Sequence, residues 1–120
     1  TFAHALEAEA GYGDTLIHGE AVALGIQLAF DLSVRLKHCP QEDSERVAHH
    51  FEAVGLPTNL SHIAGPHWTP QTLVTHMMHD KKVHEGKITF VLTRGVGQAF
   101  LTAEVDMKEL ENTLSDALSR

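Results

Sequence analysis

The stretches TFAHALE, residues 1–7, and HGEAVALG, residues 18–25, decide the fold of this chain. Apolar residues in the first stretch recur at helical spacing and predict a helix over residues 2–10. The second stretch opens a run over residues 16–37 in which apolar side chains point to nearly every side. A helix of that pattern needs neighbours on most faces, so we expect it at the centre of the domain. It carries small residues that would let another backbone approach closely, namely Gly19, Ala23 and Gly25.

A third helix is expected to start near Pro40, because proline suits the first turn of a helix, and to stop at Gly55. Its inner face is expected to hold Val47, Ala48, Phe51 and Val54. Residues 58–68 read as an irregular connection that contains Gly65 and Pro66.

A fourth helix is predicted from the cap Thr69 and the first-turn Pro70 through Asp80. Its inward residues are expected to be Leu73, Val74, Met77 and Met78. Residues 87–92 and 98–105 predict two short strands joined in a hairpin. A last helix would open at Asp106, with Glu109 completing a capping box, and bury Leu110, Leu114 and Leu118. The fold class is therefore mainly α with a small antiparallel β-hairpin.

The composition indicates one globular domain. At 120 residues with 42% apolar residues, the chain can bury a core without disulfides. Its net charge of −7 disfavours nucleic acid and anionic membranes as main partners. The single Cys39 allows no internal disulfide and has no activating motif, so we interpret it as structural. With no basic signal segment and no uninterrupted apolar run of about 20 residues, we expect a cytoplasmic protein.

His4 and His18 are the best candidates for chemistry. Imidazole is a good ligand for zinc and iron, but a closed site needs about four ligands and an HExxH pairing is absent. Glu20 lies two residues after His18, so the two side chains should diverge on one helix. The residues by themselves leave open both a metal site and ordinary polar or core histidines.

Other polar groups have simpler explanations beside the functional ones. His76 and His79 could share a metal on one helix face, whereas the adjacent pair 49–50 cannot; a solvated face explains both pairs. Lys81 and Lys82 could hold a phosphate or carboxylate, or simply stabilise a helix C-terminus.

Six blocks of sequence, taken in order, resemble the C-terminal domain of the 3-dehydroquinate synthase family. They are TFAHALEAE at 1–9, GYG at 11–13, HGEAV at 18–22, GLP at 55–57, DKKV at 80–83 and the hairpin at 86–97. The resemblance implies a dehydroquinate synthase-like helical domain over residues 1–120. It also implies that an N-terminal NAD-binding domain lies outside this chain, which would then be a fragment of a longer polypeptide.

This resemblance implies an enzyme of the shikimate pathway, and hence of aromatic amino acid biosynthesis. Such enzymes are carbon–oxygen lyases that convert 3-deoxy-D-arabino-heptulosonate 7-phosphate to 3-dehydroquinate and phosphate. They use NAD and a divalent metal, zinc or cobalt, and the reaction is redox-neutral overall. The implied partners are the sugar-phosphate substrate, the N-terminal domain and a second subunit in a homodimer.

The resemblance also assigns roles to single residues. His18 matches a metal ligand, and His4 matches a histidine that transfers protons and contacts the substrate. Lys81 or Lys82, with Lys82 preferred, matches a substrate-binding lysine. The family pattern reads His-Thr-Phe-Gly-His, so another histidine ligand would precede Thr1, and the carboxylate ligand and NAD site would belong to the N-terminal domain. The fragment alone is therefore expected to be inactive and not to bind zinc tightly.

Two departures from the family pattern keep alternatives open. Ala3 replaces the usual glycine beside His4, and the loop from Gly13 to His18 is one residue longer than usual, with Thr15 where an aromatic is common. Either change could indicate another sugar-phosphate cyclase or a metal-dependent polyol dehydrogenase of the same architecture. An alternative of another class is a non-catalytic helical interaction module whose histidines are incidental.

Overall fold

The computed structural model describes residues 1–11, 16–79, 83–84 and 86–119. Its helices are α1 (Phe2–Glu9), α2 (His18–Arg35), α3 (Gln41–Ala53), the short 3₁₀ helix η1 (Leu60–His62), α4 (Pro70–Met78) and α5 (Met107–Ser119). Its strands are β1 (Val83–His84), β2 (Lys87–Ile88), β3 (Phe90–Thr93) and β4 (Ala99–Thr102). The predicted class, mainly helical with a little antiparallel β structure, is confirmed.

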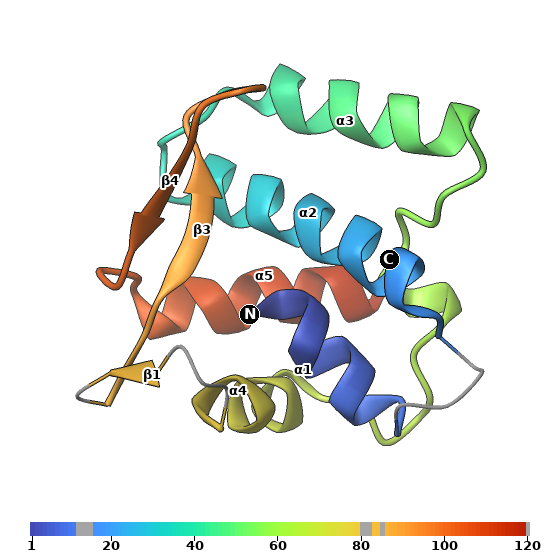
Figure 1. The fold of residues 1–120 in the computed structure, drawn as a ribbon, viewed down its shortest axis with the longest axis vertical. Helices are drawn as coiled ribbons and strands as arrows, with labels where there is room; N and C mark the ends of the chain where they lie inside the picture. Colours follow the sequence, from blue (N-terminus) through green and yellow to red (C-terminus); the bar gives the residue numbers. More distant parts are fainter. Residues whose placement is uncertain (12–15, 80–82, 85, 120) are drawn as a thin grey trace.

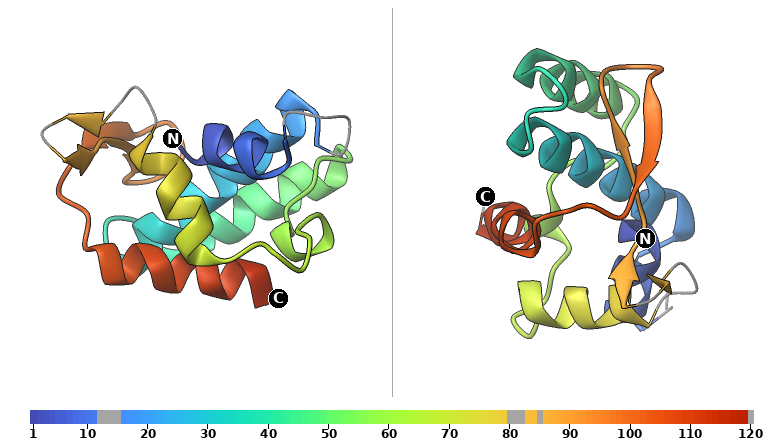
Figure 2. Two further views of the ribbon diagram at one scale, coloured as in Figure 1. Left: turned by 90° about the horizontal axis from the view of Figure 1, so that it is seen from below. Right: turned by 90° about the vertical axis from the view of Figure 1, so that its left-hand side faces the viewer.

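Helix α2 is the centre of the domain, as its apolar pattern predicts. It packs against α1, α3, α5 and β3, and Figure 1 shows it between α3 on one side and α1 and α5 on the other. In the right-hand view of Figure 2, α3 and α4 lie at opposite ends of the molecule, with α5 between their levels. One core joins α1, α2, α4, α5 and β3, and its largest fully buried side chains are Leu6, Leu24, Leu32, Leu73, Met77, Phe90, Leu92, Leu110 and Leu114. Helix α3 lies outside this core: its expected inner residues Val47, Ala48 and Phe51 are only half-buried, and its buried residue is Ser44.

Helices α1 and α2 pack closely at one of the predicted small residues. A Cβ added to Gly25 would lie 3.1 Å from the backbone nitrogen of Ala3 and 3.4 Å from Cβ of Phe2. The missing side chain thus lets the start of α1 rest on α2. At Gly19 a Cβ would meet no described atom within 4 Å, so the expected close approach is absent there.

The hairpin forms where the sequence predicts it, with shorter strands. Strands β3 and β4 pair antiparallel, and the turn closes with the Arg94 N–H donating to the Gln98 carbonyl at 3.1 Å. The predicted strand 87–92 is interrupted at Thr89, whose carbonyl accepts a hydrogen bond from Thr1 Oγ1 at 2.9 Å. The sequence analysis missed the small sheet of β1 and β2, because two-residue strands carry almost no periodicity.

Helices α3 and α4 differ from prediction at their C-terminal ends. Val54, expected to face inward, is 59% exposed because it caps α3 instead of continuing its inner face. Met78 ends α4 and is 38% exposed, while Leu73 and Met77 are buried as predicted. Pro40 is the residue before α3 and not part of its first turn.

The helix starts at α4 and α5 are set by local capping. Thr69 Oγ1 accepts from the Thr72 N–H at 3.1 Å, and Pro70 opens α4, as predicted. Asp106 accepts from the Lys108 N–H at 2.9 Å just before α5. None of the helices within the described ranges is long and apolar enough to cross a membrane.

Candidate functional site

Helix α1 presents its polar side chains in two directions. His4 and Glu7 are three residues apart and therefore share one face, with His4 exposed at its surface. Glu9, two residues beyond Glu7, points elsewhere. The opposite side of the helix, formed by Phe2, Ala5 and Leu6, is buried against the core.

Glu7 reaches the first residue of α2. Both carboxylate oxygens of Glu7 lie 3.2 Å from Nδ1 of His18. The His18 side chain is 71% exposed, whereas that of Glu7 is 18% exposed. Glu20 turns away from His18, as predicted, and its Oε1 accepts from the Ile17 N–H at 3.2 Å, which caps the start of α2.

The contact with Glu7 determines which ring nitrogen of His18 can bind a metal. An ionised carboxylate only accepts hydrogen bonds, so Nδ1 of His18 must carry the proton. The lone pair of the neutral ring then lies on Nε2. A histidine that donates one ring N–H to a carboxylate and offers the other nitrogen is the usual form of a metal-bound histidine.

A second pair of acidic and imidazole groups joins α1 to α4. Glu9 Oε2 lies 2.7 Å from Nε2 of His76, and Glu9 Oε1 accepts a hydrogen bond from Thr72 Oγ1 at 3.1 Å. Nε2 of His67 is 3.9 Å from the same carboxylate. The Glu9 side chain is only 8% exposed. His76 is thereby engaged with Glu9 and is only partly exposed, so it is not simply part of the solvated face that the sequence favoured for it.

Of the two predicted site histidines, His18 contacts Glu7, and His4 lies on the same helix as Glu7. In the described part of the chain, no group of three or more His, Cys, Asp or Glu side chains is arranged to hold a metal ion. The predicted substrate-binding Lys81 and Lys82 lie outside the described residues. Sequence reasoning missed Glu7, although its spacing of three residues from His4 was a usable signal.

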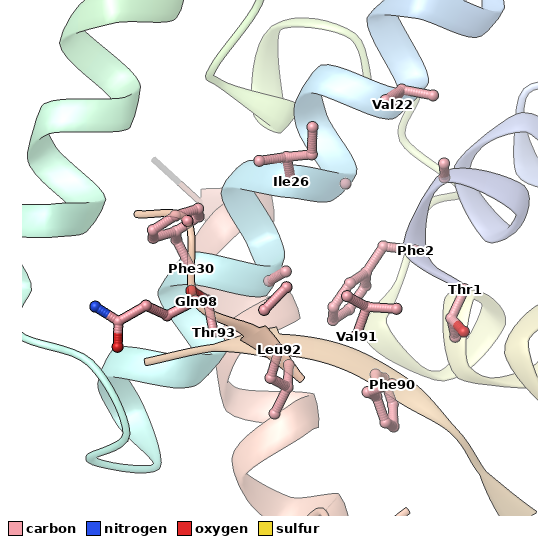
Figure 3. A pocket seen from close by; sticks show the side chains of 15 residues that line it. Thr1, Phe2, Val22, Ile26, Phe30, Phe90, Val91, Leu92, Thr93 and Gln98 are labelled. Carbon is pink, nitrogen blue, oxygen red and sulfur yellow. The ribbon is translucent and has the colours of Figure 1, made fainter. Parts of the chain in front are cut away.

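An apolar pocket of about 310 Å³ lies beside the start of α1 (Figure 3). Its walls come from α1, α2 and the β3–β4 hairpin, and include Phe2, Ile26 and Val91. Ala3, which departs from the family pattern, lies in this wall, whereas His4 and His18 do not. The methyl group of Ala3 thus contributes to an apolar surface.

Cys39 is suited to packing and not to nucleophilic chemistry. Burial raises the pKa of its thiol, and the nearby Asp43 carboxylate raises that pKa further. The thiolate fraction near neutral pH is therefore small. This agrees with the structural interpretation of Cys39 from the sequence.

Comparison with known sequences gives one consistent result. A family model described as 3-dehydroquinate synthase C-terminal matches residues 1–83. The 3-dehydroquinate synthase of Rhodospirillum rubrum is 52% identical over 120 residues, and that of Ruegeria pomeroyi is 50% identical over 119. These alignments include 99% of this chain and 31% and 32% of the relatives. The chain thus spans about a third of the length of the curated relatives that it matches.

Solved structures support the fold. A 2-deoxy-scyllo-inosose synthase, in complex with carbaglucose-6-phosphate, NAD⁺ and Co²⁺, has a TM-score of 0.76 at 21% identity. The similarity covers 96% of this chain and 32% of that one. The 2-epi-5-epi-valiolone synthase of Streptomyces hygroscopicus, with NAD⁺ and Zn²⁺ bound, has a TM-score of 0.75 at 24% identity over 94% and 31% of the two chains.

Proposed function

The chain belongs to the 3-dehydroquinate synthase family, and we propose that it contributes half of the metal- and substrate-binding site of such an enzyme. The full-length protein would convert 3-deoxy-D-arabino-heptulosonate 7-phosphate to 3-dehydroquinate and phosphate. It would do so as a cytoplasmic homodimer, with NAD held mainly by an N-terminal domain. The comparisons at 50% identity and above favour this substrate.

The observation that supports the proposal most is the contact of Glu7 with Nδ1 of His18. It leaves Nε2 of His18 as the nitrogen that would bind a divalent metal, zinc or cobalt. When bound, the metal would polarise the hydroxyl group that undergoes oxidation. In the family pattern the other ligands are a second histidine and a carboxylate from the N-terminal domain, and we propose that such groups would complete the site around His18.

The remaining roles follow the family pattern. His4, exposed on the Glu7 face of α1, would accept and return protons while contacting the substrate. Lys81 or Lys82 would bind the substrate through its charge. Removing the imidazole in His4→Ala should lower kcat about 10²–10⁴-fold, the usual contribution of a general acid or base. Measurement of steady-state kinetics with saturating NAD and metal tests this role.

A sugar-phosphate cyclase with another product is the second candidate. The two similar structures are enzymes of that kind, yet identities of 21% and 24% support only the shared fold. Ala3 lines the apolar pocket, so its extra methyl group is accommodated beside α2 and does not by itself argue for another substrate. A polyol dehydrogenase would differ from both cyclases by producing net NADH.

One assay separates these functions. Phosphate release from the heptulosonate phosphate is measured with full-length protein while NADH absorbance is followed in the same cuvette. We expect phosphate release that requires NAD, without accumulation of NADH. Accumulating NADH would indicate a dehydrogenase, and no phosphate release from metal- and NAD-replete protein would contradict the synthase.

The isolated chain offers a second test. With one proposed ligand in His18, it should neither retain zinc near stoichiometry after dialysis nor catalyse the reaction. Metal analysis of the purified chain measures this directly. Stoichiometric zinc would show that its own residues complete a site.

A further inference from the structure

We propose that Glu7 is a positioning residue that holds His18 in the orientation and tautomer needed for metal binding. The proposal rests on the function proposed above, because it takes His18 as the metal ligand. Both oxygens of the Glu7 carboxylate lie 3.2 Å from Nδ1 of His18, so the ring nitrogen is centred on the carboxylate. No other described carboxylate contacts this ring.

The chemistry of the pair favours a metal on the opposite ring nitrogen. The carboxylate keeps the proton on Nδ1 and so keeps the lone pair on Nε2. Its negative charge also increases the electron-donating strength of the ring toward a cation. The contact therefore fixes both the orientation and the tautomer of the ring.

Helix α1, which carries Glu7, contacts neighbouring helices near both of its ends. Leu6, next to Glu7, is completely buried, and the start of α1 rests on Gly25 of α2. Toward its other end, Glu9 connects α1 to Thr72 and His76 of α4. Glu7 is thus presented to His18 from a helix that is held at both ends.

Because Glu7 and His18 form an exposed pair, a role of Glu7 in metal binding can be distinguished from a role in stabilising the fold. With His18 71% exposed, the ion pair lies near solvent and should contribute little to folding stability. Loss of Glu7 should therefore change metal binding much more than the free energy of unfolding. If Glu7 only stabilised the fold, its loss would change the free energy of unfolding much more than metal binding.

The test measures the zinc dissociation constant of the full-length protein at fixed pH, by competition with a chromophoric chelator. Glu7→Ala should weaken zinc binding about 10–100-fold, the usual effect of losing such a partner. Glu7→Gln should weaken it less, because the amide oxygen still accepts from Nδ1–H but lacks the charge. With Co²⁺ in place of zinc, the visible spectrum should shift in both variants, because the donor strength of His18 changes.

Glu9→Gln is the matched control. It also removes a carboxylate charge from α1 and also alters a contact with a histidine, His76, which has no proposed role in the site. Its zinc affinity and Co²⁺ spectrum should match those of the unmodified protein. An equal loss of affinity in Glu9→Gln would show that the effect comes from general disturbance of α1.

The possible failures are distinguishable. If the unmodified protein turns over its substrate and both Glu7 variants bind zinc as tightly, the positioning role is wrong and the proposed function stands. If the unmodified protein binds no metal, the proposed function itself is wrong, and the role of Glu7 with it. Circular dichroism establishes that each variant is folded, and Glu7→Gln, which preserves shape, decides the question if Glu7→Ala does not fold.

Discussion

Two glutamates of the short helix α1, Glu7 and Glu9, each contact a histidine of another helix. The two contacts differ in distance, in burial and in the number of further partners. Glu7 contacts His18 near solvent, at 3.2 Å, with 71% of the imidazole side chain exposed. Glu9 contacts His76 at 2.7 Å from a carboxylate that is only 8% exposed and that also accepts from Thr72. Each pair joins α1 to another helix, but the first holds its imidazole largely in solvent, whereas the second centres on a carboxylate that is nearly buried. The comparison teaches that burial and additional partners, not the residue types, separate a candidate site from a structural contact.

The largest difference is expected from removing each histidine in the full-length protein. His18→Ala should abolish turnover and leave the fold intact, because a lost ligand removes the metal and not the core. His76→Ala should retain turnover per folded molecule and lower stability, since it leaves the Glu9 carboxylate poorly paired. Kinetics and circular dichroism of both variants test the comparison. Loss of turnover in folded His76→Ala would place the second pair in the site as well.

Removing each carboxylate should likewise lower stability more in the buried pair, Glu9 with His76, than in the exposed pair, Glu7 with His18. Glu9→Ala should lower the free energy of unfolding by about 1–3 kcal/mol, because Thr72 and His76 lose a nearly buried acceptor. Glu7→Ala should cost at most about 1 kcal/mol, as is usual for exposed ion pairs. Thermal and denaturant unfolding of the chain provide the two values. Equal losses would mean that exposure does not distinguish the pairs.

Thr72 tests the buried pair from the side of α4. Its hydroxyl donates to Glu9 and accepts from the Thr69 N–H at the start of α4. Thr72→Val keeps the shape and removes both interactions, so we expect a loss of about 1 kcal/mol. Thr75→Val is a suitable control, since Thr75 is exposed on the same helix and, among the described residues, its hydroxyl bonds only to the Gln71 carbonyl. A similar loss in both would assign the effect to threonine replacement in α4.

The smallest expected difference between the two pairs is in how salt changes their contribution to stability. Ions screen exposed charges strongly and buried ones weakly, so about 1 M NaCl should remove most of the stability difference between Glu7→Ala and the unmodified chain. The difference caused by Glu9→Ala should persist. Repeating the unfolding measurements at low and high salt compares the two pairs directly. Equal salt sensitivity would contradict the burial of Glu9.

The helical framework could be predicted because its signals are local. Apolar spacing placed α1 and α2 within about two residues of their observed ends, and the Thr69–Pro70 pair located the start of α4. The prediction was wrong for Val54 and Met78, which continue an apolar stripe in sequence but lie where their helices end. Burial there depends on which neighbours reach the end of a helix, and periodicity holds no such information.

What the sequence by itself determined is the family and the helical class, and it made His4 and His18 the candidates for chemistry, since all of these depend on residue types at fixed spacing. Only the tertiary structure decided which carboxylate meets which histidine. Glu7 and His18 are 11 residues apart and Glu9 and His76 are 67 apart, so each contact requires the packing of separate helices. Two nearby glutamates on α1 thus acquire different roles, because α1 has α2 on one side and α4 on the other.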